Sequence, residues 1–102
     1  MLLGNASKKP NLEHVRGMKA ALRHVLELEE DATLTINQLT CFETGCAPLE
    51  TVFGLLRPGS PQQQHKIHKA ADDVVASDLA EVCEAWGHTI DIEDLLTFFE
   101  EN

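Results

Sequence analysis

The sequence predicts an α+β fold in which about four helices pack on a small two- or three-stranded sheet. Both ends of the chain carry apolar residues at helical spacing, whereas two central stretches are short and have strand-like composition. A hydrophobic fraction of 43% indicates a folded chain. The 102 residues suffice for one domain, which we expect at residues 11–102 after a flexible tail at residues 1–10.

The first predicted helix runs from Leu12 to Leu28, with Asn11 as its N-cap. Its apolar positions form one stripe: Leu12, Val15, Met18, Leu22, Val25 and Leu26. Acidic residues gather at its C-terminal end, where the helix dipole disfavours anions, so the helix should stop there.

Residues 32–40 are predicted to form a strand. Thr33 and Thr35 alternate with Leu34 and Ile36, and threonine and isoleucine both suit strands. Thr35 and Gln38 could instead form a capping box that opens a short helical turn, and we favour the strand.

A second helix is predicted at residues 48–57. It has Pro48 at its first position and an apolar spacing of i, i+3, i+4 and i+7. A proline- and glycine-rich turn at residues 57–61 ends it, and residues 62–69 then form a short polar edge strand. Strand, helix and strand would make a right-handed crossover between parallel strands.

Two further helices complete the predicted fold. Ser77 caps a helix at residues 78–86 that stops at Gly87, and Asp91 caps a last helix at residues 92–100. The first of these helices carries Leu79, Val82, Cys83 and Trp86 at helical spacing, and the second is patterned in the same way. This spacing predicts that both helices pack on the core, with Cys83 and Trp86 buried.

Charge and composition narrow the classes of partner. The net charge of −9 argues against binding nucleic acid or an anionic membrane, because both need a positive surface. No apolar run approaches the ~20 residues of a membrane helix. Three cysteines, an odd number, favour a reducing compartment, so we expect a cytoplasmic protein.

Four residues could ligate a metal: Cys41, Cys46, His65 and His68. Thiolates and imidazoles are the donors that zinc or an iron–sulfur cluster accepts. In a strand, however, His65 and His68 would point to opposite faces, so a site with both cysteines and one histidine is the simpler form. A reversible disulfide between the cysteines and a purely structural role remain open alternatives. Cys46 would precede the N-terminus of the helix predicted at residues 48–57, a position that favours thiolate.

The stretch Thr33-Leu34-Thr35-Ile36, followed by Thr44-Gly45-Cys46-Ala47-Pro48, resembles the SufT/PaaD-like metal–sulfur cluster assembly domain. In that family a threonine-rich strand leads into a Gly-Cys-Pro loop. The stretch also resembles the C-terminal scaffold domain of NifU-like proteins. Here Ala47 separates Cys46 from Pro48, and there is no C-x-x-C pair. The resemblance implies that Cys46 is the reactive position and Cys41 an auxiliary one.

Two functional hypotheses follow. The first is a small acidic cytoplasmic interaction or accessory protein without catalysis, which binds a protein partner and could pair edge strands in a homodimer. The second is a metal- or thiol-handling accessory protein that uses Cys41 and Cys46. An enzyme is the less favoured class, because the chain has no phosphate-binding glycine loop, G-x-S-x-G or H-E-x-x-H motif.

Overall fold

A computed structural model of the chain describes residues 10–40 and 49–99. In chain order its elements are α1 (Leu12–Val25), β1 (Thr33–Thr40), β2 (Leu49–Leu56), β3 (Gln63–Ile67), the 3-10 turn η2 (Ala71–Asp73), α2 (Ala76–Ala85) and α3 (Ile92–Phe98). The predicted α+β class is confirmed. The described residues hold three α-helices, one fewer than predicted, and a three-stranded antiparallel sheet.

The missing helix is the one predicted at residues 48–57, and that prediction is wrong. Residues Leu49–Leu56 form β2, the central strand, which pairs antiparallel with β1 on one side and β3 on the other. The predicted parallel crossover is therefore also wrong, whereas the strands predicted at residues 32–40 and 62–69 are confirmed. Strand β2 carries apolar residues on both of its faces and only Leu56 is exposed, so apolar and polar residues do not alternate and the pattern can mimic a helix.

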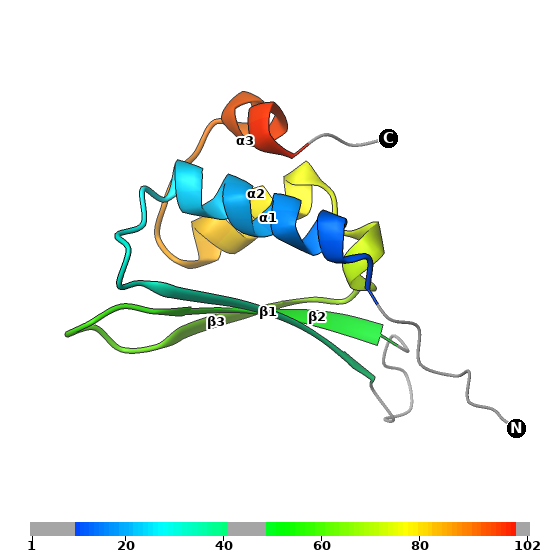
Figure 1. Cartoon of the computed structure of the whole chain (residues 1–102), viewed down its shortest axis with the longest axis horizontal. Coiled ribbons are helices and arrows are strands. Elements are labelled where there is room, and N and C mark those ends of the chain that lie inside the picture. The colour runs from blue at the N-terminus through cyan, green and yellow to red at the C-terminus, as the bar shows by residue number, and fades with distance from the viewer. Residues whose placement is uncertain (1–9, 41–48, 100–102) are drawn as a thin grey trace, which may run out of the picture.

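The helices lie on one side of the sheet (Figure 1). Helix α1 contacts β1, and α2 contacts β3. Helix α3 packs against α1 and α2 and lies farther from the sheet in Figure 1. Within the described ranges, no helix has both the length and the apolar character needed to cross a membrane.

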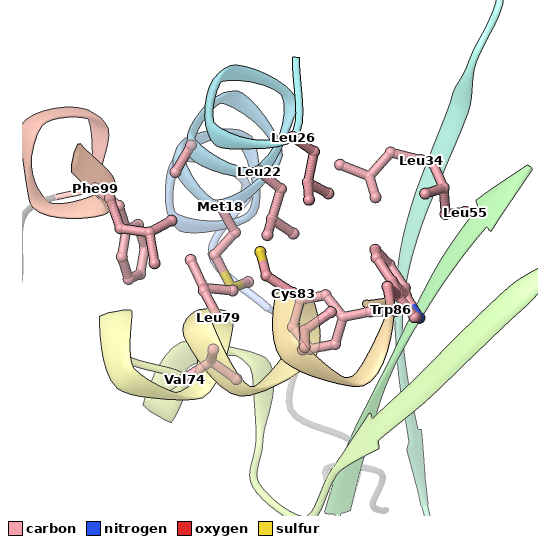
Figure 2. Close-up of a cluster of buried hydrophobic side chains, with 14 of the residues drawn as sticks. Met18, Leu22, Leu26, Leu34, Leu55, Val74, Leu79, Cys83, Trp86 and Phe99 are labelled. Carbon is pink, nitrogen blue, oxygen red and sulfur yellow. The ribbon is translucent and has the colours of Figure 1, made fainter. Parts of the chain in front are cut away.

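The hydrophobic core fills the space between the helices and the sheet (Figure 2). Met18 and Leu22 of α1 face Leu79 and Cys83 of α2, while Trp86 lies nearest the strands. The sheet contributes Leu34, Phe53, Leu55 and Ile67, all at most 6% exposed. Cys83 and Trp86 are both buried, as their places on the helical stripe predict.

Local capping signals place most helix ends. The predicted N-caps of α1 and α3 are confirmed, because Asn11 and Asp91 each accept the N–H two residues ahead at 2.9 Å. Gly87, with φ of 91°, ends α2 as predicted. The Ser77 cap is wrong, because α2 begins at Ala76. The carboxylate of Asp78 instead accepts the Val75 N–H at 3.0 Å.

Helix α1 ends at Val25, three residues before the predicted end. Glu27 adopts a left-handed conformation with φ of 51°, which turns the chain away from the helix axis. Arg23 then donates to the carbonyls of Glu29 at 2.8 Å and Ala32 at 3.2 Å, fixing the connection to β1.

Substitution of Gly54 distinguishes the observed strand from the predicted helix. In a helix interior, Gly→Ala stabilises by about 1 kcal/mol. In β2, an added Cβ would lie 2.6 Å from Thr35 Oγ1. We expect Gly54→Ala to lower the free energy of unfolding by roughly 1–3 kcal/mol in urea denaturation, because the side chains are overpacked. Most of this loss should disappear in a Thr35→Ala background, and a stabilised Gly54→Ala variant would contradict the packing.

Candidate functional site

The two cysteines of the predicted metal site, Cys41 and Cys46, lie outside the described residues. The residues that flank this segment, Thr40 and Leu49, pair with each other at the end of the β1–β2 ladder. Because a strand begins at Leu49, the helix N-terminus predicted beside Cys46 is wrong.

The two predicted histidine ligands have different surroundings. His65 lies within β3, and its Nε2 is 2.8 Å from Oε2 of Glu81 on α2. His68 follows β3 and is exposed. The structure therefore does not bring these two histidines together in one site. His65 connects the sheet to a helix, and His68 is accessible from solvent.

A second polar contact joins α2 to the segment that follows β3. Lys69 Nζ lies 2.8 Å from Asp78 Oδ2, and this hydrogen bond raises the pKa of the lysine. Together with the His65–Glu81 contact, it fastens the end of the sheet at β3 to α2. The simplest role for His65 is therefore structural.

Nothing else in the described part of the chain forms a metal centre. Residues 10–40 and 49–99 contain no group of three or more His, Cys, Asp or Glu side chains placed to hold a metal ion. Cys83 is fully buried, and burial raises the pKa of its thiol to about 11. It is a core residue, as its helical spacing predicts.

The side of the sheet opposite the helices is the candidate interaction surface, and we call it the outer sheet face. Strand register and alternation place ten residues there: Thr33, Thr35, Asn37, Leu39, Glu50, Val52, Gly54, Leu56, Gln64 and Lys66. Leu39 and Leu56 are 48% and 50% exposed near its two ends. Val52 lies between them and is half-buried. Among the described elements, no helix or strand covers this face (Figure 1).

The outer sheet face is nearly neutral on a chain of net charge −9. Its only charged residues are Glu50 and Lys66, and they neutralise each other, with Glu50 Oε2 lying 3.3 Å from Lys66 Nζ. The remaining positions are threonine, amide, glycine or aliphatic residues. The other acidic residues of the described chain therefore lie off this face.

Helix α3 offers a second set of exposed apolar side chains, with a different character. Ile92, Leu96 and Phe98 are each 40–44% exposed. Acidic residues at positions 91, 93 and 94 surround them, and the Phe98 ring already lies against His24, with centroids 4.0 Å apart. Of the two surfaces, only the outer sheet face combines exposed apolar residues with low charge.

The sequence pattern revealed only part of this face. The alternation in residues 33–37 already separates the threonines from Leu34 and Ile36, so the contribution of β1 could be predicted. The helical spacing predicts that Val52 and Leu56 are buried with Leu49 and Phe53. In β2 they lie on the outer sheet face, whereas Phe53 and Leu55 lie on the helical side. The signal that identifies a strand there is the run Thr51-Val52-Phe53 followed by glycine.

Burial of Cys83 leads to a chemical prediction. In a Cys41→Ser, Cys46→Ser double variant, Cys83 is the remaining thiol. It should react with Ellman's reagent only as the protein unfolds, because neither the reagent nor solvent reaches it. Its raised pKa should also make the protein less stable as pH rises from about 9 to about 11, since the unfolded thiol ionises first. A Cys83→Ala variant should lose that pH dependence, and rapid labelling of the native protein would contradict this account.

No protein-family model, curated protein or solved structure matches this chain. The resemblance of the Cys46 segment to SufT/PaaD-like domains therefore stays a prediction.

Proposed function

We propose that the protein is a small non-catalytic interaction or accessory protein that binds a protein partner across the outer sheet face. The observation that carries this proposal is a nearly neutral, partly apolar sheet surface on a strongly acidic chain. The centre of a protein–protein interface is typically depleted in charged residues, because burying a charge costs solvation energy. The outer sheet face has this composition.

The size of the face indicates how a partner would bind. Strand β2 has eight residues, so the face is roughly 25 Å long, and three strands about 4.8 Å apart give it a width of roughly 14 Å. This area is about half of the ~800 Å² that each partner contributes to a standard interface. A partner must therefore extend beyond the face itself.

The edge of β1 provides that extension. Strand β1 is an edge of the described sheet, and its sequence, Thr33-Leu-Thr-Ile-Asn-Gln-Leu-Thr40, contains no charge and no proline. Edge strands usually carry lysine or proline to prevent pairing with another chain. The opposite edge, β3, has five residues, includes Lys66, and is linked to α2 through His65. A partner strand is therefore expected to pair along Thr33–Asn37 of β1, before Gln38, whose side chain accepts the Ala71 N–H at 2.8 Å, and to cover the adjoining face.

Site-specific photocrosslinking tests this proposal. A photoreactive residue at Asn37, on the outer sheet face, should give one dominant protein adduct in extracts of the source cell. A control at Glu84, exposed on α2, and another at Glu93, exposed on α3, should give little or none. Val52→Lys should abolish the Asn37 adduct because it introduces an unpaired charge into the interface.

The mass of the adduct identifies the kind of partner. An adduct of twice the 11.3 kDa chain mass would identify a second copy of this chain, and another mass would identify a different protein. Equal crosslinking from Asn37 and Glu84, or an Asn37 adduct that survives Val52→Lys, would refute the proposed surface.

The second candidate function is metal or thiol handling by Cys41 and Cys46, and strand register favours it. Thr51 pairs with Ile67, so the exposed His68 follows β3 at the same end of the sheet where Thr40 and Leu49 flank the cysteine segment. A zinc ion or an iron–sulfur cluster held by both cysteines and His68 would fit this placement.

Metal analysis of untagged, anaerobically purified protein tests the second candidate. The wild-type protein should contain near-stoichiometric zinc or iron. The Cys46→Ser variant should contain none, and the His68→Ala variant should contain less than the wild type. The metal should persist in His65→Ala, the matched control, because His65 binds Glu81 within the fold. A folded, metal-free wild-type protein would contradict a tightly held metal. Equal metal loss from both histidine variants would contradict the assignment of His68.

A further inference from the structure

The end of the sheet opposite the cysteine segment contains a pocket of about 350 Å³. Its described lining consists of Arg57, Ser60, Pro61 and Gln63. This volume lies within the lower range of small-molecule sites. The pocket is not part of the outer sheet face, so it could bind a ligand independently of a partner protein.

The turn between β2 and β3 gives the pocket a rigid wall. Arg57 to Ser60 form a β-turn in which the Ser60 N–H donates to the Arg57 carbonyl at 3.1 Å. Pro58 occupies the second position, and Gly59, with φ of 77°, takes the third position of a type II turn. Pro61 follows and restricts the backbone further. The backbone of this turn is therefore restricted to one conformation before any ligand binds.

The guanidinium of Arg57 has an unsatisfied donor at this site. Its Nε is inaccessible to solvent and has no hydrogen-bond acceptor among the described residues. The nearest carboxylate, Glu29 Oε1, is 4.0 Å from Nε, which is too long for a hydrogen bond, and the Glu29 side chain is 62% exposed. Buried donors are almost always paired, so this nitrogen favours a local rearrangement that brings an acceptor within hydrogen-bond distance.

The neighbouring polar side chains, Ser60 and Gln63, can donate and accept. Gln63 donates its amide to the Trp86 carbonyl at 3.4 Å, which connects the pocket lining to α2. The indole Nε1 of Trp86 is likewise buried and has no acceptor in the described structure. Ser60 contributes an exposed hydroxyl. Arg57 is the only charged residue of the described lining, so a ligand that carries acceptor atoms suits this end of the sheet.

A carboxylate is the acceptor that fits best. The planar guanidinium fork matches the two oxygens of a carboxylate, and the nearby Glu29 shows that a carboxylate can approach Arg57. Glu27, Glu30 and Asp31 lie in the same connection as Glu29 and would repel a doubly charged phosphate more than a singly charged carboxylate. We propose that the Arg57 pocket binds a small monocarboxylate ligand, which takes the place of Glu29 beside the guanidinium.

Ligand titration followed by NMR tests this inference on the full chain. Benzoate is the probe and benzamide its neutral isostere. The indole N–H signal is a convenient reporter, because Trp86 is the only tryptophan. Benzoate should shift this signal and the Arg57 Nε–H signal in a saturable way, and benzamide should not. Inorganic phosphate at matched ionic strength should bind more weakly.

Two variants give opposite expected changes in affinity. Arg57→Lys keeps the charge but removes the fork, so benzoate binding should weaken by about tenfold or more. Glu29→Gln removes the internal competitor, so binding should tighten several-fold. Arg16→Gln is the control, because this exposed cation lies on α1, outside the described pocket lining, and should not affect binding. If Arg57→Lys fails to fold, as judged by its thermal transition, the affinity of Glu29→Gln for benzoate alone tests the proposal.

Three results would overturn the proposal. Equal shifts from benzamide would show that the carboxylate is not recognised. Phosphate binding as tight as benzoate binding would indicate a general anion site. Unchanged or weakened benzoate binding in Glu29→Gln would show that Glu29 does not compete with the ligand for Arg57. None of these results depends on the partner surface or the cysteine segment.

Discussion

The pairing of β2 with a strand on each side is the constraint on which the rest of this structure depends. Phe53 and Leu55 lie at most 1% exposed on the helical side of β2, and they form the surface on which the helices pack. Thr51, also fully buried, donates to the Lys69 carbonyl at 2.8 Å and holds the chain that follows β3. A strand so placed must satisfy its backbone on both edges and bury side chains on at least one face. The two neighbouring strands and the helical layer meet these requirements.

This same constraint explains what the sequence could and could not predict. Helix ends depend on short-range signals, so Asn11, Gly87 and Asp91 could be identified from local sequence. The alternation of β1 was equally visible. The identity of β2 depends on partners distant in the chain, because Leu49–Leu56 satisfies a helical spacing and becomes a strand only when β1 and β3 lie beside it. Gly54 was the local signal against a helix.

Some features of the candidate sites follow from local sequence, and others depend on residues that are distant in the chain. Burial of Cys83 was predictable from its position on a helical stripe, whereas the outer sheet face required knowledge of which strands are neighbours. In the sequence, Arg57 precedes a proline-rich turn, which indicates only that an element ends there. Its Nε is buried at a turn that lies near Glu29, which is distant in sequence, so local sequence does not reveal it. Cys41 and Cys46 remain candidates from sequence alone, because they lie outside the described residues.

Charge distribution connects these features. The described acidic side chains, apart from Glu50, lie on the helical side or in the connecting segments, so the outer sheet face can be covered without burying unpaired carboxylates. The Arg57 pocket and the end that carries Thr40, Leu49 and His68 lie at opposite ends of β2, roughly 25 Å apart. A ligand at one end and a metal at the other could not touch. Both ends border β2, the strand at the centre of the outer sheet face. A ligand or metal bound at either end would therefore influence partner binding through β2 and its hydrogen bonds to β1 and β3.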